Sequence, residues 1–426
     1  MKLVLIVLAF VLVALLGAPL FTLIGSIAML SFSAEDIDSS AVMVELYRIC
    51  SNPTLVAIPL FTFAGYVLAE SKTPQRLVNL ARAFFGSFTG GFAVVVLVTC
   101  AVFTAFTGAS GVTIVALGGL LFPILLKEQY PEKFALGLIT TSGSLGLLFP
   151  PSLPIILYSV TAKLSIDQLF TAGLIPGILL VVILSTYGIQ QGKKAKVPTT
   201  PFSWTNVKSS VREAIWEIPL PIIVIGGIYA GTFTATEAAA ITAFYVLIVE
   251  VFIYKDLNLF RDVPRVMRES MVLVGAILMI IGTAMGLTNY LVDNEVPLKL
   301  FEFTKTFISS ATMFLIVLNL FLIIVGMMMD IFSAIIIVVP LIIPIATAYG
   351  VDPIHLGIIF LTNLEIGYLT PPVGLNLFIS SIRFKKPVFT IVRATLPYIG
   401  ILLVALLIIT YMPSISLWLV NALGVK

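Results

Sequence analysis

The chain contains Asn363-Leu364-Glu365-Ile366-Gly367-Tyr368-Leu369-Thr370-Pro371-Pro372-Val373-Gly374-Leu375-Asn376, in which a carboxylate, a hydroxyl, amides and a double proline interrupt an otherwise apolar segment. The prolines remove backbone donors and clash with the preceding turn, while the two glycines loosen the chain on either side. A broken helix at membrane depth leaves carbonyls and amides unpaired, which is tolerated only where protein or a water-filled cavity receives them. The stretch therefore predicts a broken membrane helix with an ion or solute site at the break.

A second copy of this stretch lies 221 residues earlier, in Ser142-Gly143-Ser144-Leu145-Gly146-Leu147-Leu148-Phe149-Pro150-Pro151-Ser152. The same offset relates Pro123 to Pro344 and Gly65 to Gly286. A constant offset across several landmarks predicts two structural repeats, residues 1–215 and 216–426. Paired, proline-interrupted segments in corresponding positions of two halves indicate the binding site of a secondary transporter.

Composition places the chain in the membrane. Of its 426 residues, 59% are hydrophobic and 11% are charged, and the mean hydropathy is +1.14. Apolar runs long enough to cross a bilayer, about 20 residues each, recur along the whole sequence. We therefore predict an all-α polytopic membrane protein with the lipid bilayer as its surroundings. The basic residues lie in short loops and form no continuous face, so no nucleic-acid partner is expected.

The expected elements follow the same order in both halves. The first half is predicted to contain one or two spans at 3–31, an acidic loop, a span at 53–70, an amphipathic arm helix at 74–86, a re-entrant hairpin at 92–127, a broken helix at 134–160, a span at 168–187 and a polar loop at 188–212. The second half is predicted to contain spans at 216–231, 234–254 and 269–291, an arm helix at 297–308, a hairpin at 312–348, a broken helix at 355–382 and a last span at 391–411.

The basic residues provide an independent test of this plan. If the loop containing Lys193 and Lys194 is cytoplasmic, all of the 24 Lys and Arg residues are cytoplasmic except Arg48, Lys163, Lys299, Lys305 and Lys426. This is the asymmetry that the positive-inside rule expects. In this topology the first hairpin enters the membrane from the cytoplasm and the second from the exterior, so the repeats are predicted to be inverted.

The repeat offset pairs each hairpin tip with a helix break. Unwound carbonyls and helix ends supply oxygen ligands for a hard cation without buried fixed charge, and sodium is the expected ion. The predicted sodium-site residues are Thr107, Ala109, Gly146, Phe149 and Pro151 in the first half, and Met328, Asp330, Gly367, Thr370 and Pro372 in the second.

A polar solute requires other groups at the same breaks. Helix N-termini facing the centre suit an anionic group, and the predicted substrate-binding residues are Ser110, Ser144, Ser152, Asp330 and Asn376. An alternative stays open, because glycine and proline also occur as simple kinks in membrane helices and each serine or asparagine can be a helix-packing residue.

Three acidic residues allow two interpretations each. Asp330, at the predicted second hairpin tip, can bind sodium, carry a proton or cap the following helix. Glu365 can belong to the site or act as a structural hydrogen-bond partner. Glu237 follows Thr232-Phe233-Thr234-Ala235-Thr236 at a helix start, where capping is at least as good an explanation as function.

The sequence argues against an enzyme. Gly108-Ala109-Ser110-Gly111 matches the motif of rhomboid-type intramembrane proteases, but a serine nucleophile needs a base. The only histidine, His355, is predicted to lie in an exterior loop, far from this hairpin tip. Motifs for zinc proteases and phosphate-binding loops are absent. The rhomboid interpretation is therefore a remote alternative.

The chain resembles the large membrane subunit of tripartite ATP-independent periplasmic (TRAP) transporters. The resemblance rests on the segments Glu365–Leu377, Gly146–Ser152 and Pro59-Leu60-Phe61, and it covers essentially the whole chain. It implies an elevator transporter of the bacterial inner membrane, coupled to sodium, in which hairpins and broken helices form the moving domain.

The resemblance also implies two partners, a small membrane subunit on a separate chain and a periplasmic binding protein that delivers an organic acid. The family's substrates include C4-dicarboxylates, sialic acid and 2-oxo acids. No Lys or Arg lies in the expected site to indicate which acid is bound. The alternatives are a stand-alone divalent-anion:sodium symporter and, from another class, a channel or scaffold subunit.

Overall fold

The computed structural model describes residues 18–51, 53–197, 202–229 and 232–424, together with residues 10, 12, 13 and 16. The described residues are helical throughout, apart from turns and connecting segments. Part of the span expected at 3–31 lies outside the described residues, so the question of one or two spans there stays open. Within the described ranges, seven helices are long and apolar enough to cross a membrane, or eight if one bent pair counts as a span.

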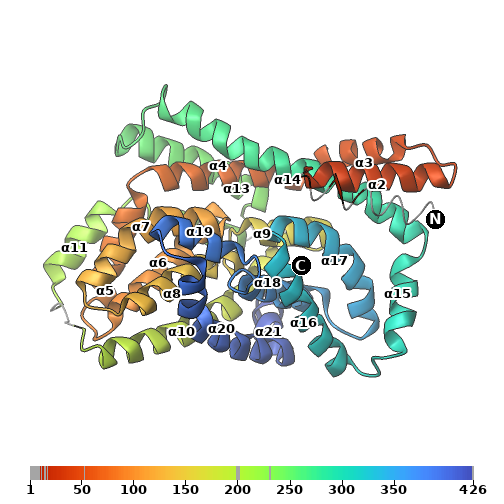
Figure 1. Cartoon of the computed structure of the whole chain (residues 1–426). Helices are drawn as coiled ribbons and strands as arrows, with labels where there is room; N and C mark the ends of the chain where they lie inside the picture. The colour runs from red at the N-terminus through yellow and green to blue at the C-terminus, as the bar shows by residue number, and fades with distance from the viewer. Residues whose placement is uncertain are drawn as a thin grey trace.

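One layer of helices lies across the top of the molecule in Figure 1 and forms a scaffold. It consists of α2 (Leu20–Ala34), α3 (Ser40–Cys50), α4 (Ala57–Glu70), α13 (Ala235–Ile248) and α14 (Asp262–Asp293). The 32-residue helix α14 contacts α2, α3 and α4. Small residues allow this close packing: a β-carbon on Gly282 would lie 2.8 Å from the Leu46 side chain.

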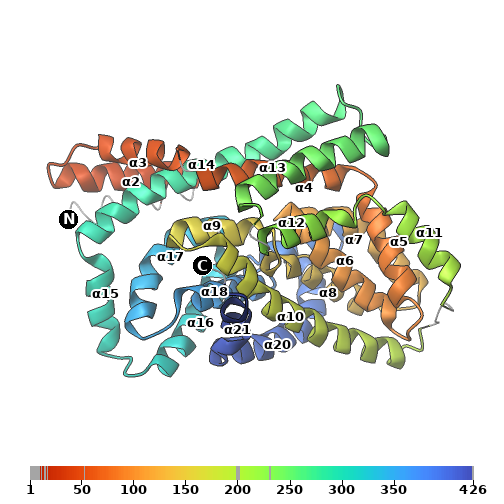
Figure 2. The same ribbon diagram turned by 180° about the vertical axis from the view of Figure 1, so that it is seen from behind.

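Two arm helices connect this scaffold to the rest of the molecule. Helices α5 (Thr73–Phe85) and α15 (Val296–Lys305) descend from opposite ends of the layer, as both views show (Figures 1 and 2). Pro74 and Pro297 occupy the first turns, where the missing amide costs no helical hydrogen bond. Both arm helices predicted from the sequence are present, although α15 ends at Lys305.

The remaining helices form a body beneath the scaffold (Figure 1). The first hairpin consists of α6 (Gly91–Thr107) and α7 (Ser110–Lys127), and the second of α16 (Ala311–Met328) and α17 (Ile331–Ala348). The broken helices consist of α8 (Glu132–Ser142), η2 (Leu145–Leu148) and α9 (Leu153–Ala162), and of α18 (Pro353–Gly367) and α19 (Leu375–Phe384). The body is completed by α10 (Ile166–Lys194), α20 (Val388–Tyr411) and α21 (Pro413–Leu423).

The helix bounds recur at the spacing read from the sequence. The first helix of each hairpin ends at Thr107 or Met328 and the second begins at Ser110 or Ile331, in both cases 221 residues apart. The Pro150-Pro151 and Pro371-Pro372 bonds are both cis. The helix ends therefore recur at the expected spacing, while the re-entrant course of the hairpins and the inversion of the repeats stay predictions.

The structure corrects several connecting segments. The described residues of the interval 188–212 are mostly helical, because α10 continues to Lys194 and a helix α11 (Trp204–Glu213) begins at the Ser203 cap. Helix α3 occupies much of the expected acidic loop, and α21 follows the last expected span. The spans expected at 53–70 and 216–231 contain α4, with 14 residues, and α12 (Pro219–Tyr229), with 11. Both are shorter than the roughly 20 residues of a single straight crossing.

A buried ionic cluster joins the first arm helix to the scaffold. The guanidinium of Arg76 contacts the carboxylates of Glu217, Glu250 and Asp256. Glu250 lies in η3 (Val249–Ile253), a π-helical turn that continues α13. The ring of Tyr254 packs 3.8 Å from the guanidinium carbon. The cluster anchors α5 where α13 ends and α12 begins.

Candidate functional site

The first helix break lies in direct contact with the first hairpin. A β-carbon on Gly146 would lie 2.3 Å from the carbonyl oxygen of Ala101 and 2.5 Å from the amide nitrogen of Ala105. At the hairpin tip, Gly108 has a φ of +65°, and a β-carbon there would meet the Leu153 side chain at 2.5 Å. The predicted meeting of tip and break is therefore present, and it depends on glycine at both places.

Buried hydroxyls gather at this first break. Thr107, Ser144 and Ser152 are fully buried, and Ser110 is buried in the first turn of α7. The side-chain oxygens of Thr107 and Ser152 have no hydrogen-bond partner in the protein. The Ser144 hydroxyl donates to the Thr141 carbonyl at 3.2 Å. Thr107 and Ser152 thus offer neutral oxygens with free lone pairs.

A pair of threonines ties the first hairpin to the break. The Thr104 hydroxyl donates to the Gly143 carbonyl at 3.0 Å. The Thr113 hydroxyl lies 2.7 Å from the Thr104 hydroxyl, and because the proton of Thr104 is already used, Thr113 is the donor of this second bond. Neither threonine was among the predicted site residues. They lie nine residues apart on different helices, and no spacing rule within one helix brings them together.

The second break is held to the second hairpin by backbone contacts. A β-carbon on Gly367 would lie 2.5 Å from the carbonyl carbon of Gly326. The Gly374 amide donates to the Met327 carbonyl at 3.0 Å, and the Ile331 amide donates to the Tyr368 hydroxyl at 2.5 Å. The Tyr368 hydroxyl at this tip was not among the predicted site residues.

Asp330 is the N-cap of α17. One carboxylate oxygen accepts from the amides of Phe332 and Ser333, each at 3.0 Å, and the other accepts from the Ser333 hydroxyl. Glu237 forms a complete capping box with Thr234. The capping interpretation is therefore realised at both acids, and Asp330 keeps only its remaining lone pairs for an ion or solute.

The two breaks differ in exposure. The first is buried from Leu145 to Ser152, apart from half-buried Phe149. At the second, Pro371 and Pro372 are exposed, Thr370 is half-buried and donates its hydroxyl to the Ile366 carbonyl, and Met328 is 61% exposed. Ala109 is half-buried and Pro151 is buried. The predicted sodium residues therefore lie in two different environments, a mostly buried one at the first break and a more exposed one at the second.

The two broken helices contact each other in the middle of the body. The Asn376 side chain, which is buried, donates to the Thr140 carbonyl at 3.3 Å. The Thr140 hydroxyl donates to the Leu136 carbonyl at 2.7 Å, so it accepts from the Ser380 hydroxyl, which lies 2.9 Å away. The side-chain carbonyl of Asn376 has no donor. Asn376 thus lies between the two breaks with an unused acceptor, as a solute-binding residue would.

The only histidine is engaged away from Ser110. Its ring nitrogens lie 3.2 Å from the Ser416 hydroxyl and 3.2 Å from the Thr410 carbonyl. The nearby Asn319 side chain donates to the Thr410 hydroxyl at 3.2 Å and accepts from Asn363 at 2.7 Å. His355 is therefore part of a polar cluster between α16, α18, α20 and α21. Its ring nitrogens contact Ser416 and Thr410, so it is not a general base for Ser110.

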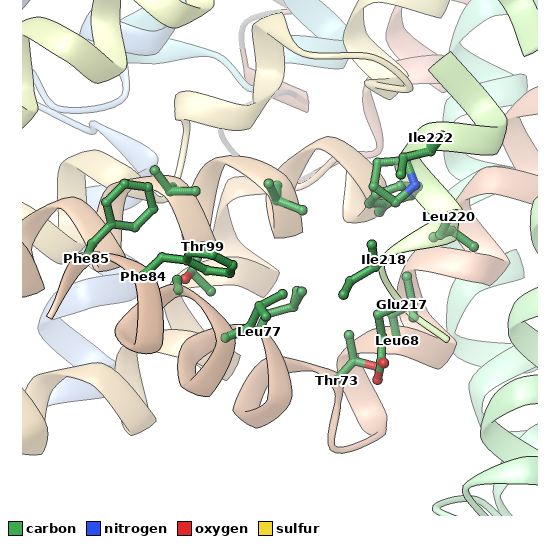
Figure 3. A pocket seen from close by; sticks show the side chains of 16 residues that line it. Leu68, Thr73, Leu77, Phe84, Phe85, Thr99, Glu217, Ile218, Leu220 and Ile222 are labelled. Carbon is green, nitrogen blue, oxygen red and sulfur yellow. The ribbon is translucent and has the colours of Figure 1, made fainter. Parts of the chain in front are cut away.

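The cavity in Figure 3 is not a site for a polar solute. It measures about 350 Å³ and lies between α5, α6 and residues 217–222. Its walls are almost entirely apolar, with Leu77, Phe84 and Leu220 among the labelled side chains. The acid on its rim, Glu217, is bound to Arg76.

Comparison with known proteins identifies the family. A family model described as "Tripartite ATP-independent periplasmic transporter, DctM component" matches residues 4–415. The chain belongs to the DctM family of TRAP transporter permeases. A DctM component is one part of a tripartite system, so this chain is a multi-pass permease subunit and not an enzyme.

Relatives within the DctM family are named after different solutes. The C4-dicarboxylate TRAP transporter large permease protein DctM of Pseudomonas aeruginosa is 38% identical, and the alignment covers 94% of each chain. The ectoine/5-hydroxyectoine TRAP transporter large permease protein UehC of Ruegeria pomeroyi is 31% identical over 97% of each chain. The isethionate TRAP transporter permease protein DctMQ of Oleidesulfovibrio alaskensis is 35% identical over 96% of this chain and 65% of its own.

A solved structure shares the fold of this DctM permease. The YdaH transporter of Alcanivorax borkumensis matches with a TM-score of 0.65 over 89% of each chain, at 12% sequence identity. At this identity the likeness extends to the fold alone. The arrangement of the described helices is thus that of a known membrane transporter.

Proposed function

We propose that this chain is the permease subunit of a sodium-coupled importer of an organic acid in the bacterial inner membrane. A small membrane subunit and a periplasmic binding protein complete the transporter. The observation that carries the proposal is the first break, where the free oxygens of Thr107 and Ser152 lie beside an unwound segment. In a chain of this family, such a site suits an ion bound and released in each cycle.

The donor set fits sodium. Hard cations take oxygen ligands, and the first break offers hydroxyl oxygens and the carbonyls of an interrupted helix without fixed positive charge. No group of three or more His, Cys, Asp or Glu side chains that could hold a metal ion occurs in the described part of the chain. Thr107, Ala109, Gly146, Phe149 and Pro151 would hold one ion. Met328, Asp330, Gly367, Thr370 and Pro372 would hold a second.

The substrate would be a carboxylate bound between the two breaks. Helices α9 and α19 begin at the breaks, and their N-terminal dipole ends suit an anion. Ser110, Ser144, Ser152, Asp330 and Asn376 are the proposed polar contacts. The C4-dicarboxylate names of several relatives support a small dicarboxylate as the first compound to test.

An elevator movement fits the division into scaffold and body. The two halves would be inverted repeats, each contributing an arm, a hairpin and a broken helix. The first hairpin tip lies against the scaffold through Gly65, where a β-carbon would meet the Phe106 carbonyl oxygen at 2.5 Å and the Thr107 α-carbon at 2.6 Å. A glycine at this contact would let the tip slide past α4, with the arms α5 and α15 accommodating the shift.

The test is uptake of labelled organic acids into proteoliposomes that contain this chain and its small subunit. The binding protein and a sodium gradient are each supplied or withheld. We expect uptake only when both are present. Uptake without the binding protein would instead favour a stand-alone sodium symporter, and uptake without sodium would remove the coupling ion from the proposal.

Replacing Thr107 with valine should remove one sodium ligand while preserving shape. We expect the apparent sodium affinity to fall by about tenfold, equivalent to about 1.4 kcal/mol for one oxygen contact, with normal insertion. Thr99→Val is the matched control. Thr99 lies on the same helix, is buried and also has an unpartnered hydroxyl, but it faces the apolar cavity. Equal sodium dependence in the two variants would contradict the assignment of Thr107.

A further inference from the structure

Helix α19 carries polar side chains on its packed face and apolar side chains on its exposed face. Asn376 and Ser380 are fully buried, whereas Phe378 and Ile382 are exposed. Asn376, Ser380 and Arg383 recur at intervals of four and three residues, so they lie along one side of the helix. A helix at the surface of a water-soluble protein has the opposite arrangement. Polar and charged side chains turned inward in a membrane protein are typical of a helix that borders a solute path.

The packed face of α19 lies along the first hairpin. Helices α19 and α7 are side by side (Figure 1). A β-carbon on Gly111 would lie 2.7 Å from the Ile379 side chain, and one on Gly119 would lie 1.6 Å from a guanidinium nitrogen of Arg383. The two helices therefore run in the same direction from the tip and the break. The guanidinium of Arg383 rests directly on the backbone of Gly119, and a larger residue there would displace it.

Arg383 is held well inside the length of the hairpin. Gly119 lies nine residues after Ser110 and eight before Lys127. At 1.5 Å per residue, the guanidinium is therefore about 13 Å along α7 from the tip. A cation in the last turn of α19 complements the dipole of that helix. The dipole explains the position of the residue, but it leaves the N–H donors of the guanidinium unused.

Two neighbouring cations are engaged, whereas Arg383 is not. The Lys386 ammonium contacts the Glu132 carboxylate at 2.5 Å, and the Arg393 guanidinium lies 4.4 Å from the centre of the Phe389 ring. Arg383 is exposed and forms no hydrogen bond or ion pair with any described residue. Its five N–H donors are thus available to an anion, and their planar arrangement matches the two oxygens of a carboxylate.

We propose that the polar face of α19 borders the path by which the organic acid leaves the breaks, and that Arg383 binds its carboxylate on the cytoplasmic side. The path starts at Asn376, whose side-chain carbonyl has no donor, and continues past Ser380. Because both residues are buried, the path is closed in this conformation, and α7 has to move away from α19 to open it. The predicted topology places Arg383 and Lys127 on the cytoplasmic side.

This inference rests on the proposed uptake of an organic acid and adds a second carboxylate site, about 13 Å from the first hairpin tip. The test measures uptake with acid on both sides of the membrane. The complex of this chain with its small subunit is placed in phosphatidylcholine vesicles that contain unlabelled succinate, or the other acid of the labelled panel that is taken up. The same acid, labelled, is supplied outside with the binding protein and a sodium gradient.

The assay separates the two faces of the transporter. External binding protein serves only complexes whose periplasmic face is outward, so the vesicle lumen contacts their cytoplasmic face. Acid in the lumen that occupies the Arg383 site changes the uptake rate, and its half-effective concentration reports the affinity of that site. The KM for external acid reports the entry side.

Arg383→Gln should raise the half-effective lumenal concentration about fivefold, the ratio for one exposed charged contact, and leave the external KM unchanged. The side chain is exposed, so the variant should fold. Arg383→Lys keeps the charge without the two-pronged contact and should have an intermediate effect. Arg393→Gln is the matched control, because it removes the same charge from another exposed arginine on the next helix, α20. It should behave as the wild type.

A second variant displaces the guanidinium without changing any charge. The methyl group of Gly119→Ala would meet the mobile end of the Arg383 side chain, so the protein should fold. It should raise the half-effective lumenal concentration, and it should add nothing to the effect of Arg383→Gln when the two are combined. Gly400→Ala is the control, because a β-carbon there would meet nothing within 4 Å. Gly119→Ala decides the inference if Arg383→Gln gives no uptake.

Three results would overturn the exit site and leave organic-acid uptake intact. The first is the same half-effective lumenal concentration in Arg383→Gln and the wild type. The second is an equal rise in the external KM, and the third is an effect confined to vesicles that contain phosphatidylglycerol, which would identify a lipid phosphate as the anion. Absence of uptake by the wild type for every acid of the panel would overturn the proposed function, and the exit site with it.

Discussion

Gly367→Ala is expected to abolish uptake and to destabilise the protein, although it adds a single methyl group. The new β-carbon would lie 2.5 Å from the Gly326 carbonyl carbon and 2.9 Å from the Met327 amide nitrogen. Both are backbone atoms, so no side chain can rotate away. Overpacking a filled interior costs about 1–3 kcal/mol where side chains can adjust, and we expect at least the upper end of this range here.

The substitution would also separate the second hairpin tip from the second break. Two hydrogen bonds depend on this contact, from Gly374 to Met327 and from Ile331 to Tyr368. Because the tip and the break are the groups proposed to form the second ion site, uptake should be lost even in protein that still folds. Thermal melting in detergent and uptake in proteoliposomes measure the two effects separately.

A glycine elsewhere in the body supplies the control. Gly400 lies within α20, and a β-carbon there would meet nothing within 4 Å. Alanine at an open helical position stabilises a helix by roughly 0.5–1 kcal/mol relative to glycine. Gly400→Ala should therefore raise the melting temperature slightly while Gly367→Ala lowers it. A similar decrease in both would show that the close contact at Gly367 is not the cause.

The helix breaks and hairpin tips could be predicted because their cause is local. Pro150-Pro151 and Pro371-Pro372 cannot continue a helix, and Gly108 can adopt a backbone conformation that other residues avoid. The 221-residue offset then located each tip opposite its break. The chemical rule and the repeat together predicted where these helices end, whereas the inversion of the two repeats stays a prediction.

The partners of individual side chains could not be predicted in the same way. The sequence predicted that Asp330 lies at a hairpin tip, but not that its carboxylate accepts hydrogen bonds from the Phe332 and Ser333 amides. Nor could it show that the first break is buried while the second is open, because burial depends on helices far away in the chain. The assignment of sodium and substrate to particular residues stays a prediction.

Some secondary structure was missed because amphipathic helices at a surface lack a strong apolar signal. Helix α11 reads as a polar stretch, and only Val207 is buried among its ten residues. Its start at Ser203 is a recognisable cap, which a closer reading of residues 202–213 could have found. Helix α3 was not predicted either, because the acidic residues before it suggested a loop.

Arg76 is the clearest case of a role hidden from sequence, and its replacement should have the largest effect on stability. The sequence predicted an amphipathic arm helix at 74–86, and nothing in that pattern marks Arg76 as a buried residue. In the folded chain its side chain is only 10% exposed and contacts three carboxylates, from residues 141 to 180 positions away. Burial alone would lower the pKa of Arg76, but Asp256, Glu250 and Glu217 raise it above its ordinary value, so the guanidinium is always charged.

Arg76→Met should destabilise the protein by about 3–5 kcal/mol, because the three carboxylates would be left buried without their cation. The arm helix α5 should detach from the scaffold, and the melting temperature and the yield of folded protein should fall together. Arg265→Met is the control. Arg265 also contacts three carboxylates, those of Glu70, Asp262 and Glu269, but its side chain is 43% exposed. An exposed pair contributes about 0–1 kcal/mol, so this variant should melt almost normally.

Neutralising the acids distinguishes charge from packing at Arg76. Replacing a whole buried ionic group with neutral residues of similar size is often harmless, whereas removing one partner is not. Arg76→Met combined with Glu217→Gln, Glu250→Gln and Asp256→Asn should therefore recover most of the lost stability. If the combined variant stays as unstable as Arg76→Met alone, the stacking of Arg76 on the Tyr254 ring would account for the anchor instead. The arm would then be held mainly by packing, and its attachment to the scaffold would not depend on the three carboxylates.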